Sequence, residues 1–226
     1  MRLIIFDIDG TLANTQEIED YCFKKAFLET LGIDISSQEW HTLVNVTDLG
    51  ITNEIFFREK QKPISNKEVD AFKENFISHL SHAFSCDKQV FKEISGAKSF
   101  FNLLTEQSNF KVAIATGSWS GSAKIKLEAI GIPYQEIPFS HSDDFISRQE
   151  IIKDAIEKSR KIFKTDFEKI IYFGDGIWDF KTCESLKIPF IGVDHNSNGK
   201  LKSLGAAFVI KDFLKPLDIL ELMVKV

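Results

Sequence analysis

The sequence predicts an α/β fold, in which a Rossmann-like parallel sheet with helices on both faces carries an inserted all-helical cap. Short apolar runs rich in β-branched residues recur along the chain, and the later ones alternate with segments of helical periodicity. The first run and the second are instead separated by about a hundred residues with almost no strand pattern, far more than a βαβ crossover needs. Strands that alternate with helices are joined by right-handed crossovers, which favours a mostly parallel sheet.

Each expected strand is a short buried run that ends at a turn. The expected strands are residues 3–8, 112–115, 170–173, 190–193 and 207–210. Ala123, Leu127 and Ile130 stand at helical spacing between two of these runs. Helices between successive parallel strands pack on both faces of the sheet.

The long first connection is predicted to be an inserted helical domain. The helical segments expected in it are residues 15–31, 37–45, 52–61 and 66–84. Ser65 before Glu68, and Ser36 and Ser37 before Glu39, are N-cap patterns. Gly96 then restarts a helix of the main domain. We therefore expect residues 1–13 and 89–226 to form the Rossmann-like core and residues 14–88 to form the cap.

The composition is that of an ordinary globular protein. Apolar residues make up 43%, and the net charge of −5 gives no reason to expect a nucleic acid as partner. The three cysteines have no CxxC spacing, which argues against zinc or a disulfide framework and favours a reducing compartment. No apolar stretch approaches the roughly 20 residues that span a bilayer, and Asp7 interrupts the first apolar run. We expect a cytoplasmic protein with no membrane partner, either a monomer or a weak dimer.

The first chemical signal is the run Asp7-Ile8-Asp9-Gly10-Thr11, directly after the first strand. In open α/β sheets, ligands bind beyond the carboxyl ends of the strands. Two carboxylates two residues apart, with a glycine that lets the chain turn, are therefore delivered to the edge where ligands bind. An acidic strand-end turn is the alternative.

Two more carboxylates, Asp175 and Asp179, follow another expected strand. The surrounding Gly-Asp-Gly is by itself only a turn signal. Beside Asp7 and Asp9, however, it gathers four carboxylates at one sheet edge, where they repel one another unless a cation neutralises them. Oxygen ligands without histidine or cysteine favour a hard ion, usually Mg²⁺.

The third signal is the strand at residues 112–115 followed by Thr116, Gly117 and Ser118. The Thr116 hydroxyl and the backbone N–H groups after it form a potential anion site at a helix start. A threonine before a helix is also an ordinary N-cap, so this signal is weak alone.

Together these runs resemble the haloacid dehalogenase superfamily of phosphotransferases, whose first, second and fourth motifs match Asp7 to Thr11, Thr116-Gly117 and Asp175 to Asp179. The resemblance covers essentially the whole chain. It implies that Asp7 is the nucleophile that forms an aspartyl-phosphate, and that Asp9 is the acid and later the base. It also implies a Mg²⁺ held by Asp7, the backbone carbonyl of Asp9, Asp175 and, directly or through water, Asp179.

The chain departs from the family at the third motif, where members commonly show a lysine followed by proline. Arg148, at an expected helix start, fits the position by its spacing to Asp175, and Lys153 is the alternative. Either cation would neutralise the nucleophile and a transferring phosphoryl oxygen, Arg148 as a planar fork. Thr116 and the backbone groups of Gly10, Thr11, Gly117 and Ser118 are the further expected phosphate contacts.

The resemblance favours a phosphatase that acts on a small phosphorylated metabolite and has a C1-type cap, as in phosphoglycolate phosphatase and β-phosphoglucomutase relatives. Dehalogenase relatives lack an acid at the position of Asp9. Mutases place a histidine on the first cap helix, where this chain has Glu19-Asp20-Tyr21. A mutase and a non-catalytic phospho-ligand-binding module remain the alternatives. Phosphoglycolate, a sugar phosphate, a nucleoside monophosphate and pyrophosphate all remain open as substrates.

The cap is expected to select the substrate. Its candidate contacts are Asn14, Thr15, Tyr21, Asn45, Thr47, Thr52, Asn53, Arg58 and Lys62. Residues 47–52 are interpreted as a loop between cap helices that reaches the site. Trp119 and Trp178, which flank the second and fourth motifs, either line the pocket or pack in the core.

Overall fold

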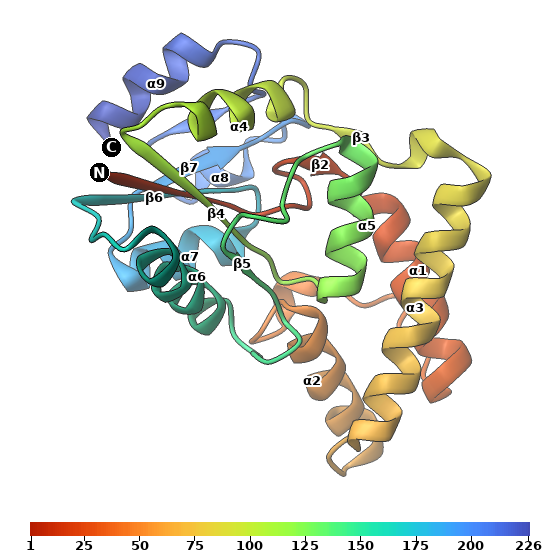
Figure 1. Cartoon of the computed structure of the whole chain (residues 1–226). Helices are drawn as coiled ribbons and strands as arrows, with labels where there is room; N and C mark the ends of the chain where they lie inside the picture. The colour runs from red at the N-terminus through yellow and green to blue at the C-terminus, as the bar shows by residue number, and fades with distance from the viewer.

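A six-stranded parallel sheet forms the centre of the larger part of the molecule in the computed structural model, which describes residues 1–226 (Figure 1). In spatial order its strands are β5 (Phe139–Ser140), β4 (Phe110–Ala115), β1 (Arg2–Phe6), β6 (Lys169–Gly174), β7 (Phe190–Val193) and β8 (Val209–Ile210). Every neighbouring pair is parallel. The predicted fold class is confirmed, although the short edge strand β5 carried no sequence signal.

Helices cover both faces of the sheet, because alternate residues of each strand point to opposite sides. In β1, Ile4 and Phe6 belong to one apolar cluster and Leu3 and Ile5 to the other. The first cluster is completed by α4 (Ala97–Glu106), α5 (Ser120–Ile130) and α9 (Pro216–Lys225); the second by α6 (Arg148–Phe163), α7 (Ile177–Leu186) and the short α8 (Lys200–Ser203). Such central strands are buried on both faces and therefore read as continuous apolar runs.

A third apolar cluster belongs to the helices inserted after β1, which we call the cap helices: α1 (Gln16–Leu31), α2 (Asp48–Lys60) and α3 (Asn66–Cys86). Aromatic rings dominate it. Phe72 lies 5.0 Å from both Phe23 and Phe27, and Phe76 lies 5.2 Å from Phe23. The insertion is bracketed by a two-stranded antiparallel ribbon, β2 (Ala13–Asn14) and β3 (Lys92–Glu93), after the short 3-10 turn η2 (Lys88–Val90). Figure 1 shows α5 lying beside α1 and α3, between the cap helices and the sheet.

Some of the predicted helix starts are present and others are not. The Ser65 N-cap is present as a capping box with Glu68, and Gly96, at φ 80°, precedes α4 as expected. The expected helix at residues 37–45 is wrong, because only the 3-10 turn η1 (Trp40–Thr42) forms and Ser36 and Ser37 cap nothing.

The expected loop at residues 47–52 is also wrong, because it is the start of α2. Thr47 is the N-cap, and its hydroxyl accepts the N–H of Gly50 at 3.0 Å. A glycine in this turn suggests a loop, but Gly50 is needed here for a close approach: a Cβ on it would lie 2.8 Å from the carbonyl oxygen of Asn45. None of the helices is both long enough and apolar enough to cross a lipid bilayer.

Candidate active site

The expected site residues meet at the carboxyl edge of the sheet, because β1 lies between β4 and β6. Phe6 pairs with Ile114 of β4 and with Phe173 of β6. Asp7, Thr116 and Asp175 each follow their strands within two residues of this register. Crossovers in a parallel sheet leave this edge open for a ligand.

Three carboxylates come together here. One oxygen each of Asp7, Asp175 and Asp179 lies within 4.8 Å of the others. Asp7 is 1% exposed, and its buried Oδ1 has no hydrogen-bond partner. Burial raises the pKa of Asp7 to about 7, although the Arg148 guanidinium opposes that shift. Burial, followed by the charges of Asp179 and Asp7, raises the pKa of Asp175 well above its usual range. A cation in the cluster would stabilise the ionised forms of both carboxylates.

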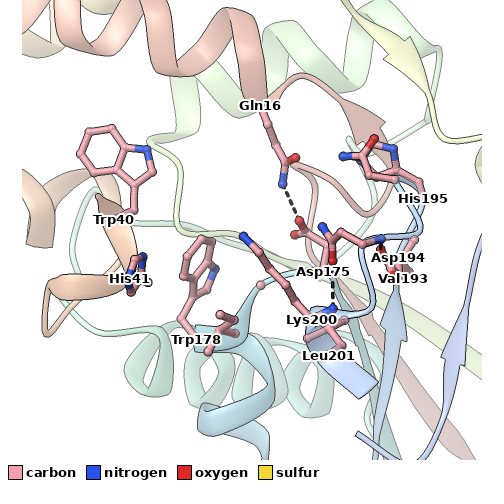
Figure 2. A pocket seen from close by; sticks show the side chains of 14 residues that line it. Gln16, Trp40, His41, Asp175, Trp178, Val193, Asp194, His195, Lys200 and Leu201 are labelled. Carbon is pink, nitrogen blue, oxygen red and sulfur yellow. Dashed lines mark hydrogen bonds between the residues drawn. The ribbon is translucent and has the colours of Figure 1, made fainter. Parts of the chain in front are cut away.

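Gly10 makes room for this cluster. It has φ +73°, in the left-handed region that favours glycine, and a Cβ there would collide with the Asp175 carboxylate. Gln16, the first residue of α1, donates its side-chain N–H to Asp175 Oδ2 (Figure 2). The first motif and the first cap helix therefore both contact the fourth motif.

Arg148 is the cation that reaches the nucleophile position. It begins α6, whose Ser147 N-cap and Glu150 form a capping box. Its Nη1 lies 3.2 Å from Asp7 Oδ2 and 2.9 Å from Asp179 Oδ1. The alternative cation, Lys153, is exposed on the same helix.

Gly117 allows the guanidinium to lie where it does, since a Cβ on this residue would be 2.7 Å from Arg148 Nη2. The sequence placed Gly117 among the phosphate contacts, and the structure adds this packing role. Arg148 also donates from Nε to the carbonyl of Val46, just before α2, at 3.2 Å. The same side chain therefore contacts both the acidic cluster and the cap.

Asp179 is held by neighbours on both oxygens. Oδ1 accepts from Arg148 and from the Tyr172 hydroxyl at 3.3 Å, while Oδ2 accepts the N–H of Gly176 at 3.0 Å. Its oxygens are therefore less free for a metal than those of Asp7. The arrangement suits a group that orients Arg148 and contacts a metal through water.

Asp9 is bound by a buried lysine that the sequence reading missed. Lys126 Nζ lies 2.8 Å from Asp9 Oδ1 and 2.7 Å from Oδ2, and Ser118 donates to Oδ2 at 2.8 Å. Thr15, an expected cap contact, donates its hydroxyl to Asp9 Oδ1. Burial acts against ionisation, but the Lys126 charge and these hydrogen bonds outweigh it and lower the pKa of Asp9 to about 2. A proton on Asp9 at neutral pH, which the role of acid requires, is therefore not favoured in this conformation.

Lys126 also pairs with Glu19 of α1, so the two groups join the core to the cap. Its side chain is 0% exposed. Burial, followed by the charge of Asp9, raises the pKa of Glu19 well above its usual range. A signal for Lys126 was present, because it stands at helical spacing from Ser122, Ala123 and Ile130 on the buried face of α5. A lysine on such a face needs a buried anion.

Above these residues lies a cavity of about 600 Å³ between core and cap. It is lined by Asp7, Asp9, Asn14, Gln16, Glu17, Glu19, Asp20, Phe23, Trp40, Val46, Thr47, Asp48, Ile51, Gly117, Ser118, Arg148, Asp175, Trp178 and Asn196. Four expected site residues are absent from this lining: Gly10, Thr11, Thr116 and Asp179. Thr116 is 1% exposed, and its hydroxyl accepts the N–H of Ser118 at 3.2 Å.

A smaller hollow of about 230 Å³ adjoins this cavity and shares Gln16, Trp40, Asp175, Trp178 and Asn196 with it. Figure 2 shows Lys200 extending into it beside Trp178 and Asp175. Of the two tryptophans that flank the second and fourth motifs, one lines the pocket and the other packs in the core. Trp178 lines both spaces, while Trp119 is buried and packs 5.4 Å from Phe72 in the cap cluster.

The cap candidates also divide. Asn14 and Thr47 line the cavity, whereas Tyr21 is 61% exposed outside it. Arg58 and Lys62 are exposed and contact Gln38, Glu59 and Glu68 instead. The remaining candidates outside the lining are Asn45, Thr52, Asn53 and Thr15, the last of which contacts Asp9. Asp48, Asp20 and Trp40 line the cavity without having been expected as contacts.

Comparison with known proteins agrees with this architecture. Solved structures that resemble the chain include a hydrolase from Pseudomonas syringae (22% identity, TM-score 0.73, covering 100% of this chain and 99% of that one). They also include CbbY from Rhodobacter sphaeroides in complex with phosphate (19%, 0.68, 96% and 98%) and a predicted phosphoglycolate phosphatase from Haemophilus somnus (18%, 0.65, 96% and 97%). At these identities the likeness shows the fold.

A search of curated protein sequences gives no significant match. The sequence profile described as haloacid dehalogenase-like hydrolase, however, matches residues 4–193, from the first strand of the sheet to the last residue of β7. The chain therefore belongs to the haloacid dehalogenase-like hydrolases.

Proposed function

We propose that this protein is a Mg²⁺-dependent phosphatase that hydrolyses a small phosphate monoester through an aspartyl-phosphate on Asp7. One observation carries the proposal: Asp7 is buried at the base of the cavity with Oδ2 beside Arg148 and Oδ1 unpartnered. A nucleophile in phosphoryl transfer needs one free oxygen and a cation that neutralises the equatorial oxygens. No other residue that lines the cavity combines the two.

The acidic cluster fits a magnesium ion. Its carboxylates are oxygen donors, they lie within 4.8 Å of one another, and the Asp7 Oδ1 atom has no partner in the protein. Asp7 and Asp175, with the Asp9 carbonyl, would hold the ion, and Asp179 would contact it through water. Bound there, Mg²⁺ supplies charge neutralisation for the phosphoryl group and for Asp7.

The chain's own residues account for the two halves of the reaction. In the first, an Asp7 oxygen attacks phosphorus, the P–O bond to the alcohol breaks, and the alcohol oxygen takes a proton. In the second, water attacks the phosphorus and loses a proton, releasing phosphate and restoring Asp7. Arg148 neutralises the phosphoryl oxygens in both halves.

Asp9 is the proposed proton carrier, and its contacts suit the second half best. Held by Lys126, it is ionised, which is the form that a base needs, but its low pKa makes it a weak base until this contact is broken. To protonate the departing alcohol it must first leave Lys126 and turn toward the cavity. On the cap side, Thr15 donates a hydrogen bond to Asp9, and Glu19 forms an ion pair with Lys126. We therefore propose that residues 14–88 act as a cap whose closure moves Asp9.

Phosphate release from an aryl phosphate tests the proposal. Wild-type protein with Mg²⁺ should release phosphate, while EDTA or Asp7→Asn should abolish release without loss of the folded circular dichroism spectrum. Normal turnover by Asp7→Asn would refute the nucleophile assignment. Turnover that persists in EDTA would refute the metal requirement.

A further inference from the structure

The cavity between core and cap has more buried or half-buried carboxylates than cations. Asp7, Asp9, Glu19, Asp48, Asp175 and Asp179 lie at or under its walls, and Lys126 and Arg148 are the only cations among them. A divalent metal and the phosphate dianion of a substrate cancel each other's charge. The excess of negative charge therefore remains when both are bound.

Both cations are already engaged. Lys126 binds Asp9 and Glu19, and Arg148 binds Asp7 and Asp179. Neither is available to the alcohol part of a substrate. A second anionic group on the substrate would therefore enter the cap side of the cavity without a counter-ion, at a cost that rises as water is excluded.

Asp48, at the first turn of α2, has no cation partner; Asp175 has none either, but it lies in the acidic cluster that would hold the metal. Asp48 is 8% exposed and forms no ion pair. Its Oδ2 accepts the N–H of Trp119 at 2.8 Å, while its Oδ1 has no hydrogen-bond donor in the protein. The backbone N–H of Asp48 donates to the Gly117 carbonyl at 2.7 Å, which fixes this residue beside the second motif. Burial, only partly offset by Lys126, raises the pKa of Asp48 to about 6, so a cationic ligand would relieve a real desolvation cost.

Resting on the proposed phosphatase activity, we propose that the substrate is a phosphate monoester whose alcohol part carries a protonated amine, and that Asp48 binds this amine. Oδ1 supplies the acceptor and the charge, and a cavity of about 600 Å³ has room for an amino sugar or a shorter amino alcohol. Glu17 of α1 lines the same cavity without an ion pair and adds to its negative field, whereas Asp20 there is paired with Lys24 at 3.0 Å. Phosphoglycolate, which carries a second anion, would be a poor substrate.

The test compares esters of similar size whose alcohol parts carry a positive charge, no charge or a negative charge. One series is glucosamine 6-phosphate, glucose 6-phosphate and 6-phosphogluconate; the other is tyramine phosphate, 4-ethylphenyl phosphate and 4-(carboxymethyl)phenyl phosphate. We expect kcat/KM for the amine ester to exceed that for the neutral ester by at least about tenfold in one or both series, with the anionic ester the poorest.

Asp48→Asn keeps an oxygen for the Trp119 N–H and removes the charge, so it should reduce the ratio of amine to neutral kcat/KM to near one. Glu59→Gln is the matched control, because Glu59 is an exposed carboxylate of the same helix outside the cavity, and it should leave the ratio unchanged. Equal ratios in wild type, or an amine preference that survives Asp48→Asn, would overturn the inference.

Lys200, which lines the adjoining hollow, forms no ion pair. A preference for the anionic esters that disappears in Lys200→Met would assign the alcohol part to that hollow and overturn the inference while leaving the phosphatase proposal intact. Absence of hydrolysis for every ester in both series would overturn the phosphatase proposal itself, and this inference with it.

Discussion

Replacing Lys126 by methionine should destabilise the protein in a way that depends on pH. The substitution keeps most of the apolar stem and removes the ammonium that binds Asp9 and Glu19. Both carboxyls are only 16% exposed, so they would be left buried without a counter-ion. Breaking a buried ion pair by removing one partner costs about 3–5 kcal/mol.

The sign of the pH dependence follows from Asp9. Its pKa is about 2 in the folded protein against an ordinary 3.8, so its ionisation stabilises the fold above pH 3.8, and this contribution is lost as the pH falls toward 2. A shift of this size is worth about 2–3 kcal/mol. Without Lys126 the pKa of Asp9 should rise above its ordinary value and that of Glu19 should rise further, because burial then acts without an opposing charge. The variant should therefore lose most stability at pH 8 and least near pH 4.5, where these carboxyls can take up protons.

Urea unfolding followed by circular dichroism at pH 8 and pH 4.5 measures this difference. Lys153→Met, which removes an exposed lysine, is the control and should change the free energy of unfolding by less than about 0.5 kcal/mol. Adding Glu19→Gln to Lys126→Met should recover part of the loss, because one buried charge disappears. A loss below about 1 kcal/mol at pH 8, or an equal loss at both pH values, would show that Lys126 does not hold these carboxylates.

Three further outcomes are expected. Arg148→Ala should lower kcat/KM for an aryl phosphate at least about tenfold, as loss of one electrostatic stabiliser does, while Lys153→Ala should not; the reverse result would move the third motif. Saturating Mg²⁺ should raise the Tm of the wild type by about 5–10 °C, and Asp175→Asn should remove most of that increase; an unchanged increase in thermal scans would place the metal elsewhere. Phe72→Ala should cost about 3–5 kcal/mol of stability in urea unfolding, because this ring is fully buried, whereas Phe57→Ala, at a 56% exposed position, should cost far less.

The sheet and its helices were predictable because apolar runs and turn glycines are both local features of the sequence. Strands buried on two faces, such as β1 and β6, read as unbroken apolar runs, and glycine at residues 10 and 96 marked where the chain turns. The start of α2 was not predictable in the same way. Its first turn depends on the Thr47 cap and on Gly50 packing against Asn45, and neither contact is distinguishable from a loop in the sequence.

The site was predictable only where a motif follows a strand. Asp7 and Asp175 come together as expected, because parallel strands carry them to one edge, and Arg148 reaches them from the start of α6. Lys126 and Asp48 reach the same place from helices far away in the sequence, and their function depends on which helix faces lie against the core. The charge of Asp9 could not be predicted either, since it is set by Lys126 rather than by the cavity.

The position of Trp119 limits how the cap of this enzyme can be replaced by the cap of a relative. The ring closes the aromatic cluster of the cap helices, yet its residue belongs to the core and directly follows Ser118, which touches Asp9. A chimaera that replaced only residues 14–88 with the corresponding segment of a relative would leave a tryptophan shaped for a different partner. Transplanting a new specificity onto this core would therefore require redesign of the start of α5 together with the cap.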